Sequence, residues 1–74
     1  MSKIKVPKFL ILSPTRELAL QVSNELRKFA EEYKVVTIYG GASISEQIKE
    51  IKKGAAIIVA TPGRLMDLME RGVV

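Results

Sequence analysis

The alternation of short apolar runs with helical segments constrains the fold of this chain more than any other feature. The apolar runs are rich in residues typical of buried strands, and we expect strands at residues 9–12, 35–39 and 56–60. The segments that follow them repeat apolar side chains at helical spacing, and we expect helices at residues 14–33, 43–53 and 62–71. Strands joined through helices by such short connections pair in parallel. The sequence therefore predicts an α/β fold built on a three-stranded parallel sheet.

The order of the strands follows from the handedness of their connections. Crossovers between parallel strands are right-handed in about 98% of cases. In the order 1-2-3 the first two helices would cover the same face, whereas the order 1-3-2 places them on opposite faces. The order 1-3-2 also puts the third apolar run, which is the most uniformly apolar, in the centre of the sheet. We therefore predict a β-α-β-α-β-α chain with the strand order 1-3-2 and helices on both faces.

Helical spacing also predicts which side chains face the sheet. In the first helix we expect one apolar stripe made of Leu18, Val22, Leu26, Phe29 and Tyr33. In the last helix the side chains expected to point inward are Leu65, Leu68 and Met69. The first strand, at residues 9–12, is apolar throughout, which is typical of a strand buried on both faces.

Composition limits the classes of function that the chain can have. A length of 74 residues with 47% hydrophobic residues allows one small domain, which we assign to residues 8–74 after a polar tail at residues 1–7. The sequence has no cysteine and no histidine, which excludes disulfides, thiolate metal sites and histidine catalysis. No apolar run approaches the roughly 18 residues of a membrane span, so we expect a cytoplasmic protein with no membrane partner. The net charge of +4 favours an anionic partner.

Two strand-to-helix turns share a pattern of a hydroxyl residue, a proline, any residue and an arginine. These turns are residues 13–16, Ser-Pro-Thr-Arg, and residues 61–64, Thr-Pro-Gly-Arg. We expect their first residues to cap the following helices, with each proline at the first helical position. The unpaired N–H groups of a helix start attract anions, and the arginines, Arg16 and Arg64, would add a charged fork suited to phosphate oxygens.

In the order 1-3-2 these two turns are neighbours at the carboxyl edge of the sheet, where open α/β sheets bind ligands. Gly40 and Gly41 end the second strand at the same edge, and the absence of a Cβ lets a ligand backbone come close. A row of three such turns suits a run of phosphates, so we predict contacts to a nucleic-acid backbone that do not identify bases. Each turn taken alone is also an ordinary helix start or chain reversal. The functional interpretation therefore depends on their meeting at one edge.

The segments Pro-Thr-Arg-Glu-Leu-Ala at residues 14–19, Gly-Gly at 40–41 and Thr-Pro-Gly-Arg at 61–64 resemble three successive motifs of DEAD-box ATP-dependent RNA helicases. In that family the motifs belong to the first RecA-like domain, and the resemblance extends from residue 8 to residue 74. It implies a partial RecA-like domain that contacts the sugar-phosphate backbone of single-stranded RNA. The residues that it assigns to RNA binding are Thr15, Arg16, Gly40, Gly41, Thr61, Gly63 and Arg64.

The same resemblance shows which motor parts these residues lack. The chain contains no Gly-x-x-x-x-Gly-Lys-Thr loop and no Asp-Glu-Ala-Asp segment, which in the family serve ATP and magnesium. We therefore expect no catalytic residue, no cofactor and no metal site in this chain. The expected function is weak binding of RNA without enzymatic activity, and the chain looks like an excised or engineered piece of a helicase.

Two other functions stay open. Residues 9–12 at the edge of the sheet would carry unpaired backbone groups, which favour pairing with another chain, so we expect a homodimer through this edge. The second function is that of an autonomously folding or self-associating structural module without a ligand. A small phosphate- or nucleotide-binding domain of flavodoxin-like type is the third alternative.

Overall fold

Parallel strand pairing organises the structure. The computed structural model describes residues 9–73, and the predicted tail at residues 1–7 lies outside this range. The elements in chain order are β1 (Phe9–Leu12), α1 (Arg16–Phe29), β2 (Val35–Ile38), α2 (Ile44–Lys53), β3 (Ile57–Ala60) and α3 (Pro62–Glu70). The strands pair in parallel in the order β1-β3-β2. The predicted α/β class and the predicted strand order are confirmed.

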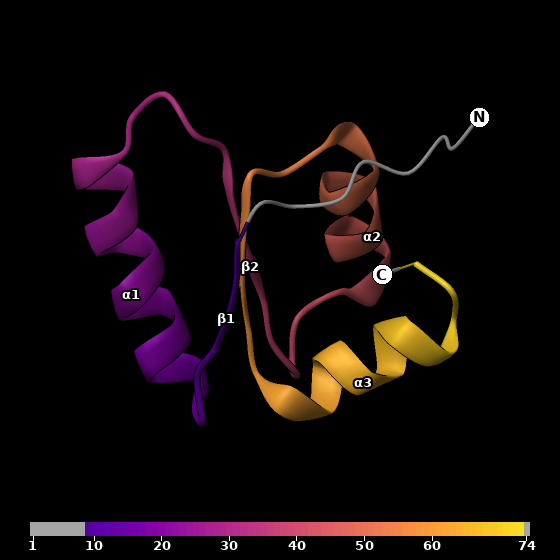
Figure 1. Ribbon diagram of the computed structural model, residues 1–74. Helices are drawn as coiled ribbons and strands as arrows, with labels where there is room; N and C mark the ends of the chain where they lie inside the picture. Colours follow the sequence, from indigo (N-terminus) through magenta and orange to yellow (C-terminus); the bar gives the residue numbers. More distant parts are fainter. Residues whose placement is uncertain (1–8, 74) are drawn as a thin grey trace.

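Helices cover both faces of the sheet, as expected, with α1 on one face and α2 and α3 on the other (Figure 1). The central strand is β3, and all four of its residues are buried. On the α1 face the buried apolar residues are Ala19, Val35, Ile57 and Val59. On the opposite face they are Val36, Ile38, Ile51, Ile58, Ala60, Leu65, Leu68 and Val73. The larger core therefore lies between the sheet and the pair α2 and α3.

The first helix begins later than expected. We predicted Ser13 as its N-cap and Pro14 as its first residue, but the N-cap is Thr15, whose Oγ1 accepts a hydrogen bond of 3.1 Å from a first-turn N–H. The first intrahelical backbone bond of α1 runs from the N–H of Ala19 to the carbonyl of Thr15 at 3.0 Å, so the helix starts after Thr15 and not after Ser13. Arg16 is therefore the first residue of α1 rather than the third.

The buried face of α1 also differs from the predicted apolar stripe. Its two buried residues, Ala19 and Ser23, are small and allow the helix to pack closely on the sheet. Of the predicted residues, Val22 and Leu26 pack against the core. The remaining predicted residues are exposed, namely Leu18, Phe29 and Tyr33. The predicted stripe was wrong because it included only large apolar side chains. It left out the small residues through which α1 packs closely on the sheet.

In α3, Leu65 and Leu68 are buried as predicted, but Met69 is 55% exposed because the other two already occupy the buried side of this short helix.

In β1, the prediction of burial on both faces is wrong. Phe9, Leu10 and Leu12 are about half exposed, because the helices pack mainly over β2 and β3 and leave much of β1 uncovered. The apolar composition of β1 thus leaves an apolar edge on this chain.

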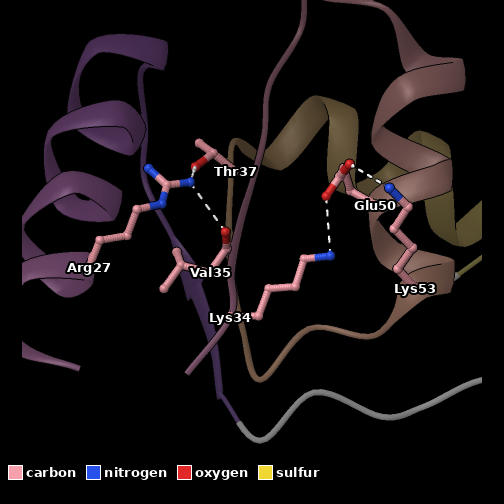
Figure 2. A network of polar contacts seen from close by, with 6 residues as sticks. All are labelled: Arg27, Lys34, Val35, Thr37, Glu50 and Lys53. Carbon is pink, nitrogen blue, oxygen red and sulfur yellow. Dashed lines mark hydrogen bonds and ion pairs between the residues drawn. The ribbon is translucent and has the colours of Figure 1, made fainter. Parts of the chain in front are cut away.

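The opposite edge of the sheet, β2, is braced by side chains from both layers of helices (Figure 2). From α1, Arg27 Nη2 donates to the carbonyl of Val35 at 3.2 Å and to Thr37 Oγ1 at 3.5 Å. From α2, Glu50 pairs with Lys34 at 3.2 Å and with Lys53 at 3.6 Å. The hydrogen bond from Lys34, followed by the charges of Lys34 and Lys53, lowers the pKa of the Glu50 carboxyl.

Candidate nucleic-acid interface

The carboxyl ends of the three strands are level with one another. In the register of the sheet, Ala60 at the end of β3 lies beside Leu12 of β1 and Ile38 of β2. The ladder continues into the turns, because the N–H of Ser13 donates to the carbonyl of Ala60 and the N–H of Thr61 donates to that of Ile38, both at 2.9 Å. The three predicted turns therefore form one row at the lower edge of the sheet in Figure 1.

At one end of this row, the side chain of Arg16 is exposed and reaches towards the glycine pair. Its Nη1 atom lies 4.0 Å from the position that a Cβ on Gly41 would occupy. Gly41 has φ +87°, in the left-handed region, whereas a Cβ on Gly40 would meet no atom within 4 Å. The first and second predicted contact regions are thus adjacent, with open space above Gly40.

The third turn holds its arginine differently. Arg64 is half-buried, and its Nη1 donates to the carbonyl of Ala42 at 3.2 Å and to Oε1 of Gln47 at 2.9 Å. Gln47 in turn donates from Nε2 to the carbonyl of Tyr39 at 3.0 Å. Arg64 is therefore tied to the glycine turn and to α2, and only part of its guanidinium is available to a ligand.

Near Arg64, the start of α3 has polar groups that a ligand could reach. Thr61 is the N-cap of α3, as predicted, but its side chain makes no capping hydrogen bond. Pro62 occupies the first helical position as expected, and a Cβ on Gly63 would meet nothing within 4 Å. By contrast, the hydroxyl of Thr15 already accepts a capping bond. The two predicted hydroxyl contacts thus differ in how freely they can turn to a ligand.

Sequence reasoning missed Gln47, which the structure places between two of the predicted contact regions. Only 7% of Gln47 is exposed, although it is polar. It occupies the buried face of α2, where its neighbours on the same side are Ile44, Ile48 and Ile51. An amide at that position of an apolar stripe was a signal in the sequence, because a buried amide needs hydrogen-bond partners.

The row of turns lies on an open surface, where Arg16, Gly40, Gly41 and Gly63 are all exposed. A cavity of about 520 Å³ lies along the outer side of β2, and its lining includes none of the seven predicted RNA-binding residues. Within residues 9–73, no three acidic side chains come close enough to hold a metal ion. In the same range, no helix is long and apolar enough to cross a membrane. An exposed row suits an extended chain better than a small enclosed ligand.

Comparison with known proteins identifies the class to which this fold belongs. Two solved structures of RNA helicases match the chain closely. A hypothetical ATP-dependent RNA helicase from Sulfolobus tokodaii matches with a TM-score of 0.81 and 43% identity over 92% of this chain and 21% of that one. The yeast DEAD-box splicing factor Prp28 matches with a TM-score of 0.85 and 42% identity over 97% of this chain and 18% of that one. The fold is that of part of a RecA-like helicase domain, as predicted.

The family follows from the sequence match. The model of the DEAD/DEAH box helicases matches residues 2–73, and the chain belongs to this family. Among curated relatives, the pre-mRNA-splicing ATP-dependent RNA helicase PRP28 of Meyerozyma guilliermondii is 55% identical over 67 residues, or 88% of this chain. The probable ATP-dependent RNA helicase DDX46 of Danio rerio is 54% identical over 65 residues, or 85% of this chain. The chain spans 12% and 6% of the lengths of these two relatives.

The two glycines of the turn provide a matched pair of variants. Gly41→Ala places a Cβ on a residue with φ +87°, and we expect it to lower the free energy of unfolding by about 1 kcal/mol. Gly40→Ala meets no atom and no positive φ, so its effect on stability should be much smaller. Urea denaturation of both variants measures the difference. Equal losses in the two variants would contradict the backbone conformation described here.

Proposed function

We propose that this chain binds the sugar-phosphate backbone of single-stranded RNA through the row of turns at the carboxyl edge of its sheet. The observation that carries the proposal is the levelling of the three strand ends, which brings the three motif segments side by side. The proposed contacts are those expected from the sequence: Thr15, Arg16, Gly40, Gly41, Thr61, Gly63 and Arg64.

The chemistry of the row supports a backbone ligand over a base-specific one. Arg16 is exposed and has no ion pair within residues 9–73, so its guanidinium is available to a phosphate. The glycines and the start of α3 offer main-chain groups, which contact phosphate and sugar without identifying bases. The relatives are named as ATP-dependent RNA helicases, which supports RNA as the nucleic acid.

We further infer that the chain has no enzymatic activity by itself. Its 74 residues include neither a phosphate-binding loop nor an Asp-Glu-Ala-Asp segment, so no group in it would hold ATP or magnesium for hydrolysis. We propose ATP and magnesium as cofactors of the longer family members only, and not of this chain. A cytoplasmic location likewise stays a prediction.

Binding to RNA should be weak and electrostatic. We expect dissociation constants in the high-micromolar to millimolar range, about −4 to −6 kcal/mol, for a short single-stranded RNA. The logarithm of the association constant should fall with the logarithm of salt concentration by about 0.7 per phosphate contact. Arg16→Ala should weaken binding by about tenfold for all base sequences, because it removes a charge-assisted contact. Fluorescence anisotropy with labelled oligonucleotides of different sequence measures all three quantities.

Lys52→Ala is the control for that measurement. It removes the same charge from the C-terminal end of α2, at the opposite edge of the sheet, where no contact is proposed. Its effect should be much smaller than that of Arg16→Ala. An equal loss in both variants would reduce the interaction to nonspecific charge, and a change of base preference in Arg16→Ala would contradict a backbone contact.

The absence of catalysis can be tested directly. The purified chain with ATP and magnesium should release phosphate at the rate of a buffer blank, with or without RNA, because nothing in it cradles the nucleotide phosphates. A malachite-green assay measures the release. Turnover above the blank that survives a second purification step would overturn this inference.

A second property is favoured by the exposed apolar surface of β1. An apolar groove of about 360 Å³ lies beside this strand, lined by Phe9, Leu10, Ile11, Leu26, Ala30, Tyr33 and Ile57. An edge strand with unpaired backbone groups and apolar flanks pairs readily with another strand. We propose that the isolated chain forms a homodimer in which the two copies of β1 pair antiparallel and extend the sheet across both molecules.

A charged residue on this edge should prevent the dimer. Leu12 is 56% exposed, and Leu12→Lys should shift the chain to the mass of a monomer at tens of micromolar, because pairing would bury the new charge. Met66→Lys is the matched control, since Met66 is 61% exposed but lies on α3. Sedimentation equilibrium measures the mass. A monomeric parent chain at all these concentrations would refute the homodimer.

A further inference from the structure

A short chain of hydrogen bonds surrounds the glycine pair. Gln47 Nε2 donates to the carbonyl of Tyr39, the residue before the glycines, at 3.0 Å. Arg64 Nη1 donates to the carbonyl of Ala42, the residue after them, at 3.2 Å. The two side chains join, because the same Nη1 donates to Gln47 Oε1 at 2.9 Å. Carbonyls on both sides of the glycine pair are thus held by one connected pair of side chains.

From this arrangement we infer that Gln47 is a positioning residue of the interface: it holds the turn at residues 39–42 in one conformation and directs the guanidinium of Arg64. The inference rests on the proposed function, because the positioned groups are two of the proposed RNA contacts. Only 7% of Gln47 is exposed, so it acts through its neighbours and not by touching RNA.

The need for such a residue follows from the glycines. Two consecutive residues without a Cβ have wide conformational freedom, and ordering them costs more entropy than ordering other residues. Within residues 9–73, the main chain of Gly40 and Gly41 makes no hydrogen bond to another part of the structure. The restraint on this turn therefore comes from its flanking carbonyls, at Tyr39 and Ala42.

The chemistry of the amide explains why glutamine suits the position. The oxygen of the Gln47 amide accepts from Arg64 while its nitrogen donates to Tyr39, so both ends of the buried group are satisfied. A glutamate could accept from Arg64 but could not donate to a carbonyl, and a methionine has no donor and accepts only weakly through its sulfur. Arg64 has five N–H donors, of which those on Nη1 serve this network, so the others remain for a phosphate.

The network also joins two contact regions that lie far apart in the sequence. Arg64 belongs to the third motif segment, and the carbonyls of Tyr39 and Ala42 flank the second. Loss of Gln47 should therefore weaken the contribution of both segments to RNA binding. It should do so without removing any group that touches RNA.

The test uses variants that separate these roles. Gln47→Met keeps the length of the side chain and removes both hydrogen bonds, and Gln47→Glu keeps only the partner of Arg64. Gln21→Met is the matched control, because Gln21 is exposed on α1. Ile48→Ala, on the same helix as Gln47, controls for a general loss of stability, since Ile48 only packs against the core. All binding is measured below the onset of unfolding of each variant.

Two readouts are needed. Nitrogen-15 relaxation reports the order of the Arg64 side-chain Nε–H and of the amides at residues 40–42 without any RNA. In Gln47→Met we expect both to become mobile, and in Gln47→Glu we expect Arg64 to stay ordered while the turn becomes mobile. Anisotropy with oligouridine should show about tenfold weaker binding for Gln47→Met and less than about twofold for Gln21→Met and Ile48→Ala.

A double-mutant cycle with Arg64→Ala decides whether Gln47 acts through Arg64. Gln47→Met should cost clearly less affinity in the Arg64→Ala background than in the parent, because coupled residues are not additive. Unchanged relaxation in Gln47→Met, or fully additive losses, would overturn the inference. If the parent chain binds no RNA, the proposed function fails, while the relaxation experiment still decides whether Gln47 positions the turn and Arg64.

Discussion

The rest of the structure depends on the pairing of β3 with a neighbour on each side. Because both pairs are parallel and share one register, the ends of all three strands are level. The same pairing extends one residue further into the turns, through the bonds from Ser13 to Ala60 and from Thr61 to Ile38. A row of helix starts and a glycine turn is the direct result. A slip of register in either pair would separate the motif segments.

The architecture could be predicted from the sequence because its causes are general. The handedness of crossovers and the need to cover both faces select the order β1-β3-β2 without knowledge of any contact. The place where α1 begins was predicted wrongly, since Ser13 and Thr15 both look like caps. In the structure the first helical bonds run to Thr15, whose carbonyl accepts from Ala19 and whose Oγ1 accepts from Leu18. The exposure of Phe9 and Leu12 was missed because composition describes how apolar a strand is and not whether a helix of this chain covers it.

The candidate site, like the fold, could be predicted from the sequence only in part. The seven predicted contact residues come from local motifs, and the structure brings their segments to one edge, but the motifs do not distinguish the two arginines. Arg16 is exposed, whereas Arg64 is half-buried and bound to Gln47, which lies 17 residues away in the chain. Such a bond depends on how α2 and α3 pack on one face of the sheet. Side-chain networks of this kind result from the packing of helices on the sheet, and the spacing of motifs does not predict them.

The two edges of the sheet differ in a way that limits how many copies could join. The carbonyl of Val35 in β2 accepts from Arg27, and the carbonyl of Tyr39, the residue after the strand, accepts from Gln47. Within residues 9–73, no side chain bonds to the outward carbonyls of β1 in this way. In the proposed homodimer, each molecule would therefore pair through β1 and not through β2. A dimer joined through β1 would carry β2 at both of its outer edges, where the side chains of Arg27 and Gln47 oppose the addition of a further strand.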